Sequence, residues 1–111
     1  MNNITFDDFE KVEIVVGTII NASNNIKAIK PAYILEIDFG SLGIKISSAQ
    51  ITENYEIKDL IGQQVIAVLN FPAKKIAGIK SECLVLAAVC DENGTVLLQP
   101  NLFVKNGIRV K

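Results

Sequence analysis

The sequence predicts an all-β domain, because its apolar residues gather in strand-length runs separated by turn signals. Half of the 111 residues are hydrophobic, which is enough for one compact core. Leu35, Ile37 and Phe39 alternate with other residues, as in a strand with one buried face. Val65–Phe71 and Cys83–Val89 are apolar runs of strand length, which favour strands buried on both faces.

The N-terminal residues predict a short amphipathic helix and a first strand. Thr5 is a typical helix cap, and Phe6 and Phe9 lie three positions apart on one helical face. The run Val12–Asn21 is rich in β-branched residues. Its interior Gly17 favours a bulge or a tight bend, as in small barrels that turn a corner.

Three connections follow from turn residues and from changes in periodicity. Residues 22–31 are mostly polar and end at a proline, so we expect a loop there. Gly40–Gly43 predicts a turn that joins the strand before it to Ile44–Ser47 as a hairpin. Beyond Ser47 the period of two is lost, and Leu60–Gly62 resembles a helix end closed by glycine.

The C-terminal part predicts further short strands or an arm. Glu92–Gly94 is a turn signal before Val96–Gln99, and Asn106–Gly107 precedes Ile108–Val110. About five core strands, with a non-strand segment between the third and the fourth, match the Greek-key barrel called the OB-fold. We therefore predict a five-stranded OB-fold barrel with short helices and N- and C-terminal extensions.

Composition narrows the function. The net charge is only −1, so any polyanion must be met by a local basic patch. Histidine is absent, which removes the commonest general base and metal ligand, and we expect no cofactor and no metal. An enzyme would also have to work without a phosphate-binding glycine loop, so we expect a binding protein. Glu36 and Asp38 are interpreted as a solvated stripe on one strand.

The N-terminal residues and the cysteines indicate a cytoplasmic protein. Met1–Glu10 carries three acidic residues instead of the basic start of a secretory signal. The apolar run Cys83–Cys90 is much shorter than the roughly 20 residues of a membrane-spanning helix, and we expect no membrane insertion. A straight strand would hold its two terminal Cα atoms about 23 Å apart, so these cysteines cannot pair within it.

The most informative segment is Asn70–Glu82, NFPAKKIAGIKSE, which places three lysines on one connection between two apolar strands. We expect a surface loop that offers positive charge to phosphates. Gly78 would allow close backbone approach, and Asn70 and Ser81 would offer amide and hydroxyl groups. A solvated basic hairpin without a ligand is the alternative interpretation of the same charges.

This segment resembles the signature of the tRNA-binding domain family, in which an Asn and an apolar residue precede a basic loop, a Gly and a Ser-Glu pair. Phe9–Ile19 resembles the opening strand of that family, and Phe39–Ile51 resembles its central hairpin. Ser47–Thr52 and Asn70–Pro72 are closest to the CsaA branch.

The resemblance implies a single OB-fold domain over residues 1–111, with its core at about 8–107. CsaA-type proteins are homodimeric, export-related chaperones that bind unfolded or precursor polypeptides, and the wider family binds tRNA. The resemblance therefore implies that this protein is a homodimer that binds polypeptides and contacts the secretion machinery. The alternative ligand that it implies is tRNA. The exposed face of the N-terminal helix gives dimerisation a physical motive.

Two binding hypotheses remain open. An apolar groove beside the basic loop would accept side chains of an unfolded segment. Alternatively, the lysines would contact phosphates of structured RNA, whereas single-strand binding by stacking is disfavoured because the chain has no tryptophan. The candidate binding residues for either ligand are Lys45, Ser47, Ser48, Gln50, Asn70, Phe71, Lys74, Lys75, Ile76, Gly78, Ile79, Lys80, Ser81 and Glu82.

Overall fold

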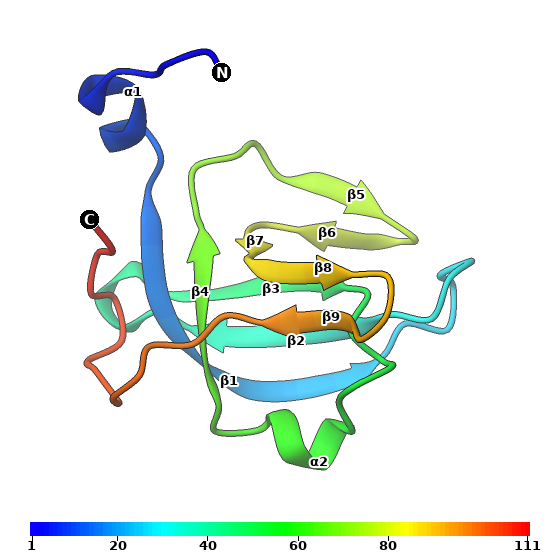
Figure 1. Cartoon of the computed structure of the whole chain (residues 1–111). Helices are drawn as coiled ribbons and strands as arrows, with labels where there is room; N and C mark the ends of the chain where they lie inside the picture. The colour runs from blue at the N-terminus through cyan, green and yellow to red at the C-terminus, as the bar shows by residue number, and fades with distance from the viewer.

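The computed structural model describes residues 1–111 and consists mainly of strands, with few short helices (Figure 1). The elements in chain order are α1 Phe6–Glu10, β1 Ile14–Asn24, β2 Tyr33–Asp38, the 3-10 helix η1 Gly40–Leu42, β3 Ile44–Ala49, α2 Ile57–Leu60, β4 Gln64–Val68, β5 Lys74–Ile76, β6 Ile79–Ser81, β7 Leu84–Val85, β8 Ala87–Cys90 and β9 Gly94–Leu97.

Five strands form one antiparallel sheet in the order β3-β2-β1-β4-β7. Because β4 returns beside β1 after the β1-β2-β3 meander, the connection is a Greek key. Two separate hairpins, β5-β6 and β8-β9, extend this sheet into a nearly closed barrel (Figure 1). The predicted all-β OB-fold barrel with short helices is confirmed.

The barrel closes between β3 and the chain that follows β6, largely through side chains. The Glu82 amide donates to Ile46 O at 2.7 Å, and the Ile46 amide donates to the Glu82 carboxylate at 3.1 Å. The Ser48 amide donates to Ser81 Oγ at 3.2 Å. Along this edge, a carboxylate and a hydroxyl thus accept the amide hydrogen bonds that the carbonyls of a neighbouring strand would otherwise accept.

The core fills the barrel interior. Leu35, Ile37 and Phe39 are fully buried, as their predicted alternation requires. Leu60 from α2 is also fully buried and belongs to the same apolar cluster. The short helix ends at Leu60, and a glycine follows it as predicted. Ile61 is extended and Gly62 has a φ of +88°, so Gly62 belongs to a turn in which the Gln63 amide donates to Leu60 O at 3.0 Å.

Asn70 and Arg109 fasten the segment that leads into β1. The Asn70 side chain accepts from the Glu13 amide at 2.9 Å and donates to Lys11 O at 2.6 Å. Arg109 bridges to Val15 through its backbone, and its guanidinium donates to Glu10 O at 2.6 Å. The two termini therefore lie on the same side of the barrel (Figure 1).

Helix α1 projects from this side of the barrel, and none of its residues is buried. Thr5 caps the helix, as expected from the sequence, and the structure adds a reciprocal capping box with Asp8. Every helix in the chain is too short and too polar to span a bilayer.

Three expectations about the strands need correction. Gly17 pairs in regular register with Val65, and the irregularity in β1 lies between Ile19 and Asn21. Gly17 is required for packing instead, since a Cβ there would lie 2.6 Å from the Phe39 ring. Strand β1 also continues to Asn24, so the polar loop begins later than predicted.

The run Cys83–Val89 is two strands and is not buried on both faces. Leu86 donates its amide to Ile66 O at 2.8 Å and accepts from the Leu98 amide at 3.3 Å, so the chain leaves β4 and joins β9 at this residue. Val89 is 82% exposed. Cys83 belongs to the core, whereas Leu84 and Val89 are exposed at a hollow, because the chain turns between two ladders.

The packing at Gly17 generates a prediction about stability. We expect Gly17→Ala to lower the free energy of unfolding by about 1–3 kcal/mol, because the added methyl collides with the Phe39 ring and with Ile37. Urea denaturation of the variant measures this loss. The double variant Gly17→Ala/Phe39→Leu should recover part of it, and strictly additive losses would contradict the packing explanation.

Candidate ligand-binding site

The basic connection is the β5-β6 hairpin and not an irregular loop. Ile76 pairs with Ile79, and between them Ala77 and Gly78 have φ values of +47° and +82°. Two consecutive positive φ values are typical of the two-residue type I′ turn, whose twist matches that of the flanking strands. The turn therefore needs Gly78 for its backbone conformation.

The hairpin holds its lysines in an electrostatically unfavourable arrangement. Lys75 lies directly opposite Lys80 in the ladder, and both side chains are exposed. Like charges at opposite positions destabilise a hairpin, and neither lysine has an acidic ion-pair partner. An anionic group bound here would relieve this repulsion.

Hollows surround the hairpin. The Phe71 hollow, of about 270 Å³, lies between the chain that enters β5 and the chain that leaves β6. Phe71 itself is 56% exposed, so it lies at the surface and not in the core. Its lining residues are Phe71, Pro72, Lys74, Ile76, Ser81, Glu82, Cys83 and Leu84.

The Lys27 hollow, of about 440 Å³, lies between the β1-β2 loop and the hairpin. Asn25 shapes that loop, because its side-chain oxygen accepts from the Lys27 backbone amide at 3.2 Å and its own backbone amide donates to Ala32 O at 2.9 Å. The Lys27 side chain lies over Gly78. The lining residues are Lys27, Ala28, Ile29, Lys30, Ala32, Ser48, Gln50, Ile76 and Ala77.

The β3-β8 hollow, of about 390 Å³, lies where β3 passes the β8-β9 hairpin. It shares Leu84 with the Phe71 hollow and shares Ser48 and Gln50 with the Lys27 hollow, so the three hollows are neighbours. None of its lining residues is charged. They are Ser47, Ser48, Ala49, Gln50, Ile51, Leu84, Val85, Leu86, Ala87, Val89, Thr95 and Leu97.

Several candidate polar residues also hold the barrel together. Asn70 fastens the start of β1, while Ser81 and Glu82 close the barrel against β3. Ser47 is buried and donates to Cys83 O at 3.2 Å. These side chains have partners within the fold, so any contact they make with a ligand comes in addition to a structural role.

The fourteen candidate binding residues do not all lie at the hollows. The structure brings eight of the fourteen to the lining of the hollows: Ser47, Ser48, Gln50, Phe71, Lys74, Ile76, Ser81 and Glu82. Lys75, Gly78, Ile79 and Lys80 belong to the hairpin without lining a hollow. Lys45 is half-buried on β3, opposite Ile37, and lines none of the three hollows.

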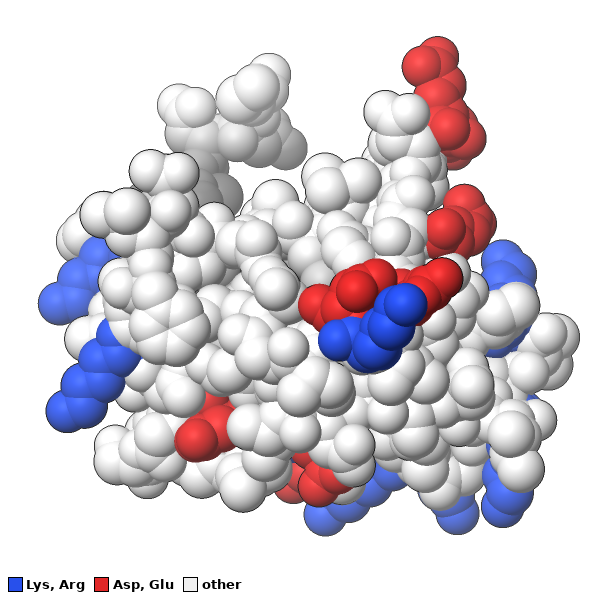
Figure 2. Space-filling view, turned by 90° about the horizontal axis from the view of Figure 1, so that it is seen from below, with Lys and Arg blue, Asp and Glu red and all other residues white.

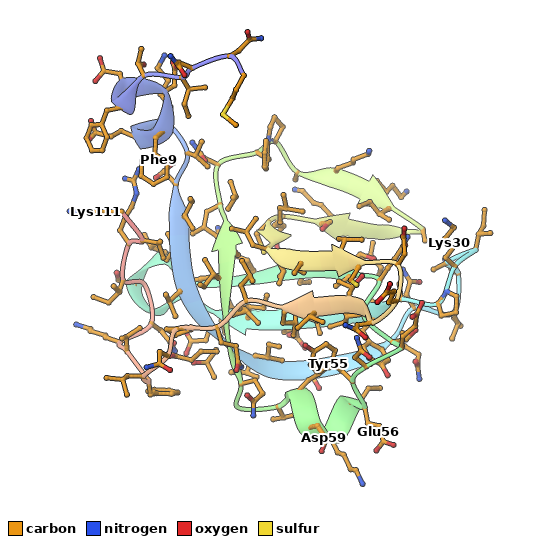
Figure 3. All side chains as sticks on the ribbon, viewed as in Figure 1. Phe9, Lys30, Tyr55, Glu56, Asp59 and Lys111 are labelled. Carbon is orange, nitrogen blue, oxygen red and sulfur yellow. The ribbon has the colours of Figure 1, made fainter.

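Lys27 and Lys30 were not predicted from the sequence, although the structure places their loop beside the hairpin turn. Lys30 lies at the end of the molecule where that loop projects (Figure 3). Ile29, between them, is fully exposed. The signal that identifies them is the alternation of isoleucine and lysine in residues 26–30, which is similar to that in residues 75–80.

The charges leave no broad basic surface on the face that carries α2. Figure 2 shows that the middle of this face is mostly uncharged apart from one mixed cluster, while other basic atoms lie along its margins. Lys58 on α2 lies 3.5 Å from Glu56, which offsets its charge. No group of three potential metal-ligating side chains occurs in the chain.

Both cysteines are free thiols, and Cys83 lies at the closure of the barrel. Burial raises the pKa of the Cys83 thiol from 9.0 to about 11, and the negative charge of Glu82 adds to the rise. The hydrogen bond with Ser47 and the positive charge of Lys45 act in the opposite direction. The Cys83 thiol is therefore neutral and unreactive at physiological pH.

Residues 14–109 match the family model described as "Putative tRNA binding domain". Among solved structures, the chain is 49% identical to the chaperone CsaA from Bacillus anthracis, covering 99% of this chain and 100% of that one with a TM-score of 0.93. It is 47% identical to the CsaA chaperone from Picrophilus torridus, covering 98% and 100% with a TM-score of 0.92.

Curated relatives are much longer. The chain is 39% identical, over 87% of its length, to a methionine–tRNA ligase from Methanococcoides burtonii, and 34% identical, over its whole length, to one from Pyrococcus horikoshii. It spans only 14% and 15% of these two proteins. The similarity therefore concerns one domain of the ligases.

The raised pKa of Cys83 makes stability depend on pH. The unfolded thiol ionises near pH 9 and the folded one near pH 11, so this contribution is complete below pH 9 and is lost as the pH rises through 11. Relative to Cys83→Ala, the wild type should lose roughly 2 kcal/mol of its advantage between pH 8.5 and about 11. Urea denaturation at each pH measures the difference, and a constant difference would contradict the assignment.

Proposed function

Because the chain belongs to the tRNA-binding domain family, we propose that it is a non-enzymatic, CsaA-type binding protein that holds unfolded or precursor polypeptides in the cytoplasm and serves protein export. The observation that carries the proposal is the set of three neighbouring hollows, of which the β3-β8 hollow has no charged residue and the other two combine apolar with charged residues. The similarity to two CsaA chaperones over nearly the whole chain supports it. We propose that residues 1–111 act as one binding domain.

The exposed apolar side chains around the hairpin fit a polypeptide ligand. Phe71 is 56% exposed, Leu84 48% and Ile76 38%, and all three line the Phe71 hollow. Such surfaces are costly in water and gain free energy when they bury apolar side chains of a partner. An unfolded chain offers such side chains together with free backbone groups, whereas a folded surface offers few of either.

A second candidate function, the binding of tRNA, is favoured by the lysines of the hairpin and of the β1-β2 loop. Lys74, Lys75 and Lys80 lie on one hairpin, and the Lys27 side chain lies over its turn. Lysines contact phosphates as point charges, which provides affinity with little sequence specificity. The family membership and the methionine–tRNA ligase relatives support this function.

We further propose that the protein is a homodimer. Phe6 on α1 is 70% exposed, and Leu102 and Phe103 near the C-terminus are 76% and 75% exposed. Phe9 and the C-terminal Lys111 lie on the same side of the barrel (Figure 3). A second copy that covers these apolar side chains would bury them symmetrically and would leave the β5-β6 hairpin of each copy free.

Salt dependence separates the two ligands. We expect Lys75→Ala/Lys80→Ala to reduce the slope of log affinity for total tRNA against log salt by about 1.5, because two phosphate contacts are lost. Binding of an unfolded polypeptide should change little, because neither lysine lines a hollow. Fluorescence anisotropy at several salt concentrations measures both affinities.

The control for this experiment is Lys58→Ala/Lys111→Ala, which changes the net charge equally at positions outside the hairpin. An equal effect of the two double variants would contradict a hairpin site for tRNA. If the wild type fails to bind any unfolded polypeptide at low or high salt, the main proposal is wrong.

The dimer proposal predicts a change of mass in solution. Leu102→Asp/Phe103→Asp should convert the dimer to monomers at micromolar concentration, because buried carboxylates without partners are costly. Ile26→Asp/Ile29→Asp, on fully exposed residues of the β1-β2 loop, is the control and should remain dimeric. Sedimentation equilibrium gives the masses, and a monomeric wild type would rule out the proposal.

A further inference from the structure

The β3-β8 hollow lies between the end of β3, beyond its hydrogen bond to Ser81, and the edge of β8 away from β9. β3 pairs only with β2, and β8 pairs only with β9, so no backbone ladder joins β3 to β8. Residues of both strands line the hollow, namely Ser47 to Ala49 from β3 and Ala87 and Val89 from β8. Unpaired edges are templates for a further strand.

The direction of the backbone groups on β3 follows from its contacts. In an antiparallel ladder, alternate residues direct their amide and carbonyl groups toward the partner strand and away from it. The amides of Ile46 and Ser48 donate to the Glu82 and Ser81 side chains, on the side away from β2. The same alternation directs Ser48 O and the Gln50 amide outward, and neither has a partner in the fold.

The backbone groups on β8 are fixed in the same way. The Leu98 amide donates to Leu86 O, so the even-numbered residues of this segment pair with β9. Ala87 and Val89 therefore direct their amide and carbonyl groups away from β9. Both residues line the hollow, which thus has free backbone donors and acceptors on two opposite walls.

The side chains of the hollow indicate the chemistry of its occupant. Its lining has no charged residue and includes Leu84, 48% exposed, and Val89, 82% exposed. A polyanion finds no countercharge there, whereas apolar side chains find apolar contacts. At the end nearest the β1-β2 loop, the Lys27 hollow begins and adds Lys27 and Lys30.

We propose that an extended polypeptide segment inserts between β3 and β8 as an additional β-strand and completes the barrel. The segment carries uncharged, alternately apolar residues in the hollow and acidic residues at the end that meets Lys27 and Lys30. The inference rests on the proposed binding of unfolded polypeptides, and it specifies how and where they bind.

Synthetic peptides of about seven residues test the mode of binding. The probe alternates valine and threonine and ends in two aspartates at one terminus. Two further peptides carry N-methyl groups on alternate backbone nitrogens: one series methylates the nitrogens that would face β3, and the other methylates those that would face β8. We expect each N-methylated series to bind about tenfold or more weakly than the parent peptide, because it loses the hydrogen bonds to one wall while its side chains are unchanged.

The protein side of the test uses two matched substitutions on one hairpin. Val89→Lys, in the hollow, should weaken the probe about tenfold, because it places a charge among apolar contacts. Val96→Lys, on β9 and outside the hollow, is also at an exposed valine and should leave affinity unchanged. Thermal melting of both variants checks that the hairpin stays folded.

Amide hydrogen exchange identifies the strand directly. On addition of the probe, the amides of Gln50, Ala87 and Val89 should become slow to exchange. If either N-methylated series binds as tightly as the parent peptide, or if total tRNA protects these amides instead, the inference is overturned. If the wild type binds an unfolded protein but fails these tests, only the inference is wrong. If it binds no polypeptide at all, the proposed function is wrong as well.

Discussion

The hydrogen bonds of Glu82 and Ser81 to β3 are the constraint on which the rest of the site depends. They occupy the edge of β3 only as far as Ser48, and two of the three use a side chain, so no backbone ladder forms along this edge. A full backbone ladder would have closed the barrel completely. The partial closure keeps Cys83 in the core and leaves the edge of β3 beyond Ser48 without a partner strand.

The same closure explains why the site contains two kinds of surface. The β5-β6 hairpin ends at Ser81, and its lysines place positive charge in solvent. The β3-β8 hollow begins just after it and carries no charge. Lysines that are exposed to water attract anions at long range, and an apolar hollow gains from desolvation at short range. A small barrel thus offers distinct chemistry to apolar and to anionic groups.

Much of the fold could be predicted from the sequence because local rules decide it. The alternation of Leu35, Ile37 and Phe39, the cap at Thr5 and the glycine after α2 each act within a few residues, and the structure contains all three. The family signature in residues 70–82 also identified the hairpin as the connection of interest. These signals need no knowledge of the tertiary contacts.

What could not be predicted depends on contacts between distant segments. Gly17 was interpreted as a bend, whereas the ring of Phe39 is what excludes a side chain there. The break at Leu86 arises because its two backbone groups pair with two different strands. Lys27 and Lys30 join the site only because the β1-β2 loop folds over the hairpin turn. The contacts of Gly17 and Leu86 leave no periodic trace in the sequence, and the pattern in residues 26–30 does not show which segment the loop will contact.

The position of Leu86 in two ladders has a mechanical consequence. The β8-β9 hairpin joins the sheet at this residue, and its far edge is held by Asn54, whose side chain donates to Asn93 O and to Thr95 O at 3.1 Å, and by Tyr55, which accepts from the Leu97 amide at 2.9 Å. The hairpin is therefore held at two places, by backbone hydrogen bonds at Leu86 and by the side chains of Asn54 and Tyr55 along β9. Because Leu97 of β9 is 8% exposed and belongs to the core cluster, the same contacts also keep the core covered.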